Sequence, residues 1–102
     1  MHLVQILLPL CDASGKRFER SAFERITQEL SERFGGVTLY ARAPATGLWK
    51  ASPGKTARDD IVVCEVMVDM LEPEWWRRYR QRLEQTFAQD EIVVRSQEIT
   101  RL

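Results

Sequence analysis

The sequence predicts one α+β domain spanning residues 1–102, a four-stranded antiparallel sheet with two helices on one face. Three observations support this. A chain of 102 residues with 44% hydrophobic content suits one hydrophobic core. Four segments have the alternation or β-branched content of strands, and two carry apolar residues at helical spacing. Their order, βαββαβ, is that of ferredoxin-like folds, and right-handed crossovers then give the spatial strand order 4-1-3-2.

The first half of the chain contains a strand, a helix and a second strand. The first strand covers residues 3–8 and ends at Pro9, which cannot donate to a ladder. Ser21 and Glu24 form a capping-box pattern that predicts the start of the helix, and Gly35-Gly36 predicts its end. The second strand covers residues 37–43. The apolar stripe of the helix is Phe23, Ile26, Leu30 and Phe34.

The second half begins with an irregular connection, residues 44–59, which contains Trp49 and several Gly and Pro residues. A β-branched strand follows over residues 61–70. Pro73 is expected in the first turn of the second helix, where its missing N–H costs nothing. The last strand covers residues 91–99. The second helix has the stripe Trp76, Tyr79, Leu83 and Phe87.

Strand alternation divides the sheet into a helix-covered face and an open face. In the antiparallel pair of strands 37–43 and 61–70, a turn closing near residues 43 and 60 makes partner numbers sum to 103. This register agrees with the face assignment. The open face is too apolar to meet water alone, so we expect an isologous homodimer through it. Its residues are Leu3, Gln5, Leu7, Thr38, Tyr40, Arg42, Ile61, Val63, Glu65, Met67, Val93, Arg95 and Gln97.

One polar row crosses this face. If the remaining strands pair in register, the row reads Thr38, Glu65, Gln5, Arg95, with Glu65 and Arg95 about 10 Å apart. One interpretation is a hydrogen-bonded stripe that fixes dimer register. The other is a pocket in which Glu65 is a desolvated base and Arg95 holds an anion. The candidate ligand-binding residues are Gln5, Tyr40, Arg42, Trp49, Glu65 and Arg95, with Glu65 a weak catalytic candidate.

Trp49 has two interpretations: it folds back over the open end of the sheet, or it lines the mouth of a ligand site.

Composition and motifs exclude several functions. Fifteen basic and fifteen acidic residues balance, which argues against a dedicated nucleic-acid binder. Contact with nucleic acid through the arginines of residues 77–82 is a less favoured alternative to a solvated helix face. One histidine and two separated cysteines make no metal site. No nucleotide or hydrolase motif is present, so no cofactor is expected.

The start of the chain superficially resembles a signal peptide. It lacks a basic region and has Pro9-Leu10 where processing needs small residues. Its apolar run is also too short to span a membrane. We therefore expect a cytoplasmic protein with no membrane partner.

Five segments carry a resemblance to known proteins: FGGVT at 34–38, GLWK at 47–50, DIV at 60–62, Trp76 with YR at 79–80, and FAQDEI at 87–92. With these, the chain resembles an uncharacterised bacterial family of small ferredoxin-like proteins. The resemblance implies no activity or cofactor. More distantly, the architecture is similar to dimeric α+β barrels, which include cofactor-independent oxygenases, isomerases and binding proteins.

Three functional hypotheses follow from the sequence. The first is a cytoplasmic homodimer that binds a small ligand or partner at the open sheet face, under the 44–59 connection. The second is a cofactor-independent enzyme of the dimeric-barrel type, in which Glu65 is the acid or base and Tyr40 or Arg95 assists. The third is nucleic-acid contact through the arginine helix.

Overall fold

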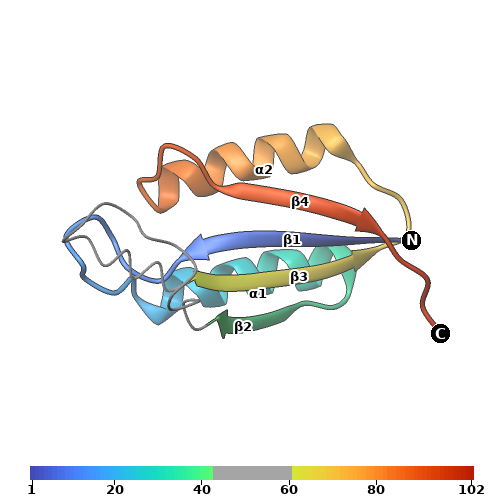
Figure 1. The fold of residues 1–102 in the computed structure, drawn as a ribbon, viewed down its shortest axis with the longest axis horizontal. Helices are drawn as coiled ribbons and strands as arrows, with labels where there is room; N and C mark the ends of the chain where they lie inside the picture. Colours follow the sequence, from blue (N-terminus) through green and yellow to red (C-terminus); the bar gives the residue numbers. More distant parts are fainter. Residues whose placement is uncertain (43–60) are drawn as a thin grey trace, which may run out of the picture.

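A computed structural model describes residues 1–42 and 61–102. The element order is βαββαβ, as predicted (Figure 1). The four strands form one antiparallel sheet in the order β2-β3-β1-β4, which is the predicted order 4-1-3-2 in reverse. The elements are β1 (His2–Pro9), α1 (Arg20–Phe34), β2 (Thr38–Arg42), β3 (Ile61–Val68), α2 (Pro73–Thr86) and β4 (Val93–Glu98).

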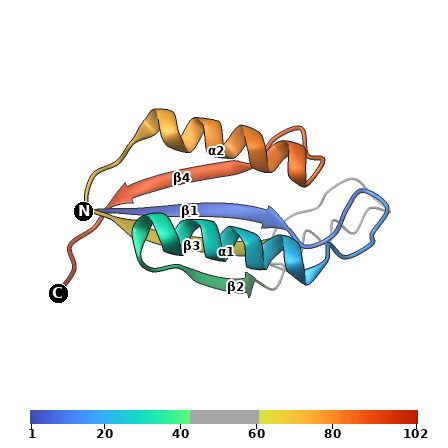
Figure 2. The same cartoon turned by 180° about the vertical axis from the view of Figure 1, so that it is seen from behind.

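Both helices cover the same face of the sheet, and the core lies between the two layers (Figures 1 and 2). Phe87 is fully buried and packs against Phe18 and Phe23, with ring centroids 4.9 and 5.5 Å apart. Trp76 stacks on Phe34 at 5.2 Å, which confirms that it packs in the core. The strand residues in this core are those assigned to the helix-covered face, among them Val4, Ile6, Leu8, Val62, Cys64, Val66 and Val68.

The capping-box prediction for α1 is wrong. The helix begins at Arg20, and Glu19 is the N-cap residue without a side-chain cap bond. Ser21 therefore lies inside the first turn, where its hydroxyl is past the position that caps a helix. Glu24 pairs with Arg20 at 3.1 Å instead. The other end is as predicted, because Gly35 has φ +88°, the left-handed conformation that favours glycine.

Strands β3 and β4 are shorter than predicted, and β1 is longer. Strand β2 begins one residue later than predicted, at Thr38, and the predicted end at residue 43 lies outside the described residues. Residues 69 and 70 follow β3 as a bend, and residues 91 and 92 precede β4. Pro9 is the last residue of β1, an end position where a missing donor is tolerated. Pro73 opens α2, which confirms its predicted position.

No helix in the described ranges is long and apolar enough to cross a membrane. A cytoplasmic location stays a prediction from the sequence.

Candidate binding site on the open sheet face

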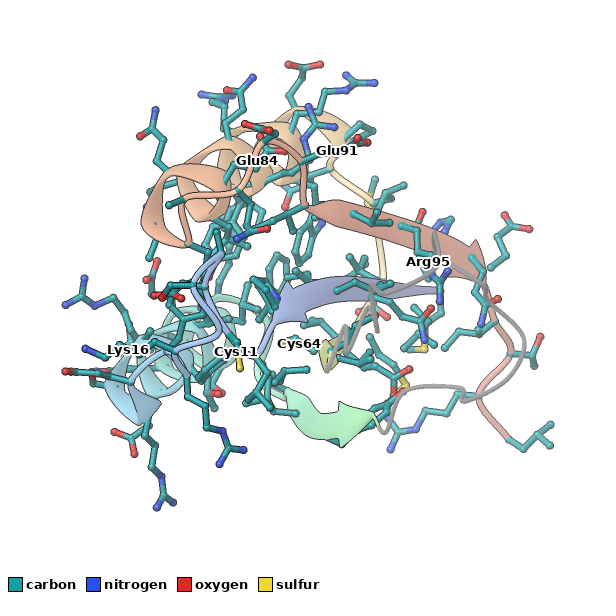
Figure 3. The ribbon with its side chains drawn as sticks, turned by 60° about the vertical axis from the view of Figure 1, so that its left-hand side comes forward. Cys11, Lys16, Cys64, Glu84, Glu91 and Arg95 are labelled. Atoms are coloured by element: carbon teal, nitrogen blue, oxygen red, sulfur yellow. The ribbon has the colours of Figure 1, made fainter. Side chains whose placement is uncertain are left out.

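The polar row predicted from alternation lies in register across all four strands. Gln5 on β1 is directly opposite Glu65 on β3 and opposite Arg95 on β4. Glu65 is in turn opposite Thr38 on β2, in the register whose partner numbers sum to 103. The row therefore reads Thr38, Glu65, Gln5, Arg95. Arg95 lies on the side of the sheet away from α1 (Figure 3).

The Gln5 side chain joins the two charges of this row. Its Nε2 donates to Oε2 of Glu65 at 2.7 Å, and its Oε1 accepts from Nε of Arg95 at 3.0 Å. The amide uses its donor on the carboxylate and its acceptor on the guanidinium, so both contacts involve a charged partner. Glu65 and Gln5 are half-buried and Arg95 is exposed. The arrangement holds one negative and one positive group at fixed positions on an apolar sheet.

The rows on either side are mainly apolar. One reads Met67, Leu3, Gln97, and the other reads Tyr40, Val63, Leu7, Val93. Met67, Val93 and Tyr40 are each more than 40% exposed. Val63 differs from the expectation for this face, because it is only 3% exposed where Leu7 and Tyr40 flank it across the strands. Exposed apolar side chains therefore surround the charged row.

An open groove of about 1110 Å³ adjoins the end of this row that contains Thr38 and Glu65. It lies where the start of β1, the end of β3 and the turn between α1 and β2 meet, since these three segments share one end of the sheet. Glu65, Thr38, Leu3 and Met67 come from the open face. The other lining residues are Met1, Arg33, Phe34, Gly35, Gly36, Val37, Val68, Asp69, Met70, Glu72, Ile99 and Arg101.

Charges of both signs line the groove. The Arg33 guanidinium pairs with Glu72 at 3.2 Å and lies 4.4 Å from the centre of the Trp75 ring, so its position is fixed from two sides. Arg101 and the carboxylates of Glu65 and Asp69 line the groove as well. All three methionines of the chain are in the lining, and their flexible thioethers adapt to varied apolar shapes.

The structure brings together some of the six predicted ligand residues. Gln5, Glu65 and Arg95 form one hydrogen-bonded group, and of these only Glu65 reaches the groove. Tyr40 lies in the neighbouring row opposite Val63. Arg42 is opposite Ile61 in the β2–β3 register, and Trp49 lies outside the described residues.

Sequence reasoning missed the groove residues outside the strands, chiefly Arg33, Arg101 and Met70. The signal was present in the topology. Because β2 follows α1 and runs antiparallel to β3, the Gly35-Gly36 turn has to lie beside the residues that follow β3.

The arginines of α2 are largely paired. Arg77 bonds to Glu74, Arg82 bonds to Glu29 of α1, and Arg80 lies 4.0 Å from Glu84. These carboxylates offset the positive charge, which favours the solvated-face interpretation over contact with phosphate.

Neither cysteine belongs to the site. Burial, followed by the nearby charge of Glu65, raises the pKa of the Cys64 thiol to about 12, so it behaves as a small core residue. Cys11 is half-buried at the opposite end of β1 from the groove (Figure 3). No group of three His, Cys, Asp or Glu side chains that could hold a metal ion occurs within residues 1–42 and 61–102.

Three side-chain donors of α2 are buried. Trp76 Nε1, the Tyr79 hydroxyl and Arg80 Nε have no hydrogen-bond partner among the described residues, and all three atoms are closed off from solvent. Burial raises the pKa of Tyr79, as expected for a phenol enclosed by the core. These groups belong to the packing of the two helices.

Comparison with known proteins adds support for the fold. No protein-family model matches the chain, and no curated protein sequence matches it. Among solved structures, the chain is similar to a phage SAM lyase in complex with S-methyl-5′-thioadenosine. The TM-score is 0.60 with 15% sequence identity, over 95% of this chain and 80% of that chain. This likeness supports a small α+β fold, and the resemblance to a bacterial family stays a prediction.

Proposed function

We propose that this protein binds a small organic ligand in the groove beside Glu65. The observation that carries the proposal is the combination of a large open groove with a carboxylate whose position is fixed by Gln5. A fixed charge within an apolar surface gives a ligand orientation as well as contact area.

The lining indicates the class of ligand. Leu3, Phe34 and the methionine side chains provide apolar contact, while Glu65 provides a hydrogen-bond acceptor with negative charge. The ligand should therefore have an apolar part and a cationic or hydrogen-bond-donating part. Nucleosides with an apolar substituent have this character. The ligand of the structural neighbour, S-methyl-5′-thioadenosine, is one of them and is a suitable first probe.

Thermal unfolding with added ligand tests the proposal. The panel contains S-methyl-5′-thioadenosine, other nucleosides and cationic amino acids, each at millimolar concentration. A ligand present at 100 times its Kd stabilises the folded state by about 2.7 kcal/mol. In a domain of this size that raises the midpoint by roughly 10 °C or more. A panel in which no compound raises the midpoint would contradict the proposal.

Variants then locate the binding site. Glu65→Gln removes the charge but keeps the shape of the side chain, so we expect the Kd measured by calorimetry to rise at least tenfold. Glu91→Gln makes the same change outside the groove and should leave Kd unchanged. Equal affinity in both variants would place the ligand elsewhere. If the ligand is consumed and Glu65→Gln abolishes turnover, the enzyme hypothesis is favoured over simple binding.

A further inference from the structure

We infer that the open sheet face docks a second copy of this chain in one register, with Glu65 of each copy opposite Arg95 of the other. The inference goes beyond ligand binding and does not depend on it. It rests on the order of side chains across the sheet, and chiefly on the positions of Glu65 and Arg95 on the two strands that flank β1.

The row containing the charges is self-complementary. Glu65 and Arg95 lie on β3 and β4, one strand spacing to either side of Gln5 on β1. A two-fold axis between two facing sheets, parallel to β1 and above it, exchanges the positions of β3 and β4. Each Glu65 then faces Arg95 of the second copy, and the two Gln5 side chains face each other.

The apolar rows match under the same operation. Leu7 faces Leu7, and Val63 faces Val93, so one flanking row is apolar on both sides. In the other row Leu3 faces Leu3, and Met67 faces Gln97. The mean strand directions of the two sheets stay aligned, which is one of the two common packings of sheets.

The competing two-fold arrangement brings like charges together. If the axis lies perpendicular to the strands, along the polar row, Glu65 faces Glu65 and Arg95 faces Arg95. Opposed like charges in a closed interface disfavour that register. The charge pattern thus selects the axis parallel to β1.

The size of the face indicates a reversible dimer. The axis above β1 places β3, β1 and β4 of the two copies against each other and leaves β2 outside the interface. These three strands of six to eight residues, spaced ~4.8 Å apart with ~3.4 Å per residue, give roughly 350 Å² per copy. The total of about 700 Å² is below the ~1,200–2,000 Å² of standard stable interfaces. We therefore expect dissociation in the micromolar range. The zero net charge of the chain offers little repulsion against association.

The interface would also cover part of the ligand groove. Leu3, Glu65 and Met67 belong to both, so a ligand and the second copy would compete for these residues. This one consequence rests on the proposed ligand site. The interface itself is tested without ligand, and a chain that dimerises but binds no ligand refutes only the proposed function.

Sedimentation velocity over 1–500 μM of the purified chain tests the interface by charge reversal. We expect Arg95→Glu to raise the dimer Kd roughly tenfold or more, and Glu65→Arg to do the same. The double variant Glu65→Arg/Arg95→Glu restores opposite charges across the axis, so its Kd should return to within about threefold of the original. Arg78→Glu, an exposed position on α2, is the matched control and should have no effect.

Thiol cross-linking tests the axis separately, in a Cys11→Ser background. Leu3→Cys lies beside the axis, with the two copies about 10 Å apart across the packed sheets, so a short bismaleimide cross-linker should join them in a covalent dimer. Gln97→Cys lies in the same row on the neighbouring strand and should not, because the two Gln97 positions are far apart across the axis. Circular dichroism confirms that each variant is folded.

Four results would overturn the inference. They are a strict monomer at 500 μM, a closed trimer, a double variant as weak as the single ones, and cross-linking through Gln97→Cys in place of Leu3→Cys.

Discussion

Replacement of Gln5 by Met tests whether one side chain joins the charges on the open sheet face. Met has the same unbranched length but cannot donate to Glu65 or accept from Arg95, so the variant loses both bonds. Hydrogen bonds to charged groups contribute about 1.5–3 kcal/mol each. The value here is lower, because Arg95 is exposed and Glu65 half-buried.

We expect a loss of roughly 1–2 kcal/mol of unfolding free energy. For a domain of this size this corresponds to a fall of about 4–16 °C in the midpoint. The assay is urea unfolding followed by tryptophan fluorescence, with the protein below 1 μM so that dimerisation contributes little.

A double-mutant cycle with Glu65→Met, which removes the acceptor, isolates the Gln5–Glu65 bond. We expect a coupling free energy of about 0.5–1.5 kcal/mol, while independent sites add within roughly 0.3–0.5 kcal/mol. Coupling below ~0.3 kcal/mol would show that the two side chains act independently in solution and would contradict a hydrogen bond between them.

The remaining predictions concern the core, the cysteines and the turn at residues 12–16. Phe87→Ala should cost about 3–5 kcal/mol in urea unfolding, because a fully buried ring leaves a cavity; a loss under ~1 kcal/mol would contradict this packing. Alkylation of the folded chain at pH 8 should add one label, at Cys11 and not at Cys64, whose thiol is buried with its pKa raised to about 12; mass spectrometry showing two labels would disprove it. The pKa of Asp12 is lowered by hydrogen bonds from the Ser14 side chain and the Lys16 backbone, so its contribution is present above the ordinary value of 3.8 and lost as pH falls through the folded pKa. Asp12→Asn should therefore destabilise the chain at pH 6, and its difference from the parent chain should shrink between about pH 4 and pH 2; a difference independent of pH would be evidence against this role.

Strand alternation predicted more of the site than composition or motifs did. A strand exposes every second residue on the same face, so placing Thr38 and Glu65 on one face left few allowed registers between their strands. The βαββαβ element order, with right-handed crossovers, left few possible strand orders. The extension of the row to Gln5 and Arg95 depended on the registers of β1 with β3 and of β1 with β4. The sequence offered no independent check on these two registers. The structure places all four residues in that row.

Local chemistry was less informative at helix ends. Ser21 and Glu24 form a valid capping pattern, yet Glu24 also lies four residues after Arg20, and that ion pair belongs to a helix that starts earlier. The capping box and the Arg20–Glu24 ion pair therefore predict helix starts that differ by one or two residues.

The groove was beyond reach of residue-by-residue reasoning. It is formed by Arg33, Met70 and Arg101 from three separate segments, and none of these residues has a distinctive motif around it. Only the assembled topology, in which the α1–β2 turn meets the end of β3, brings them together.

The most direct test of the groove as the binding site is an amide NMR titration. ¹⁵N-labelled protein is titrated with the panel compound that stabilises it most, and the amides of Gly35 and Gly36 in the groove are compared with that of Gly15 at the other end of the sheet. We expect saturable shifts at Gly35, Gly36 and Glu65, with Gly15 unchanged. Shifts centred on Gly15, or none in the groove at saturation, would contradict it.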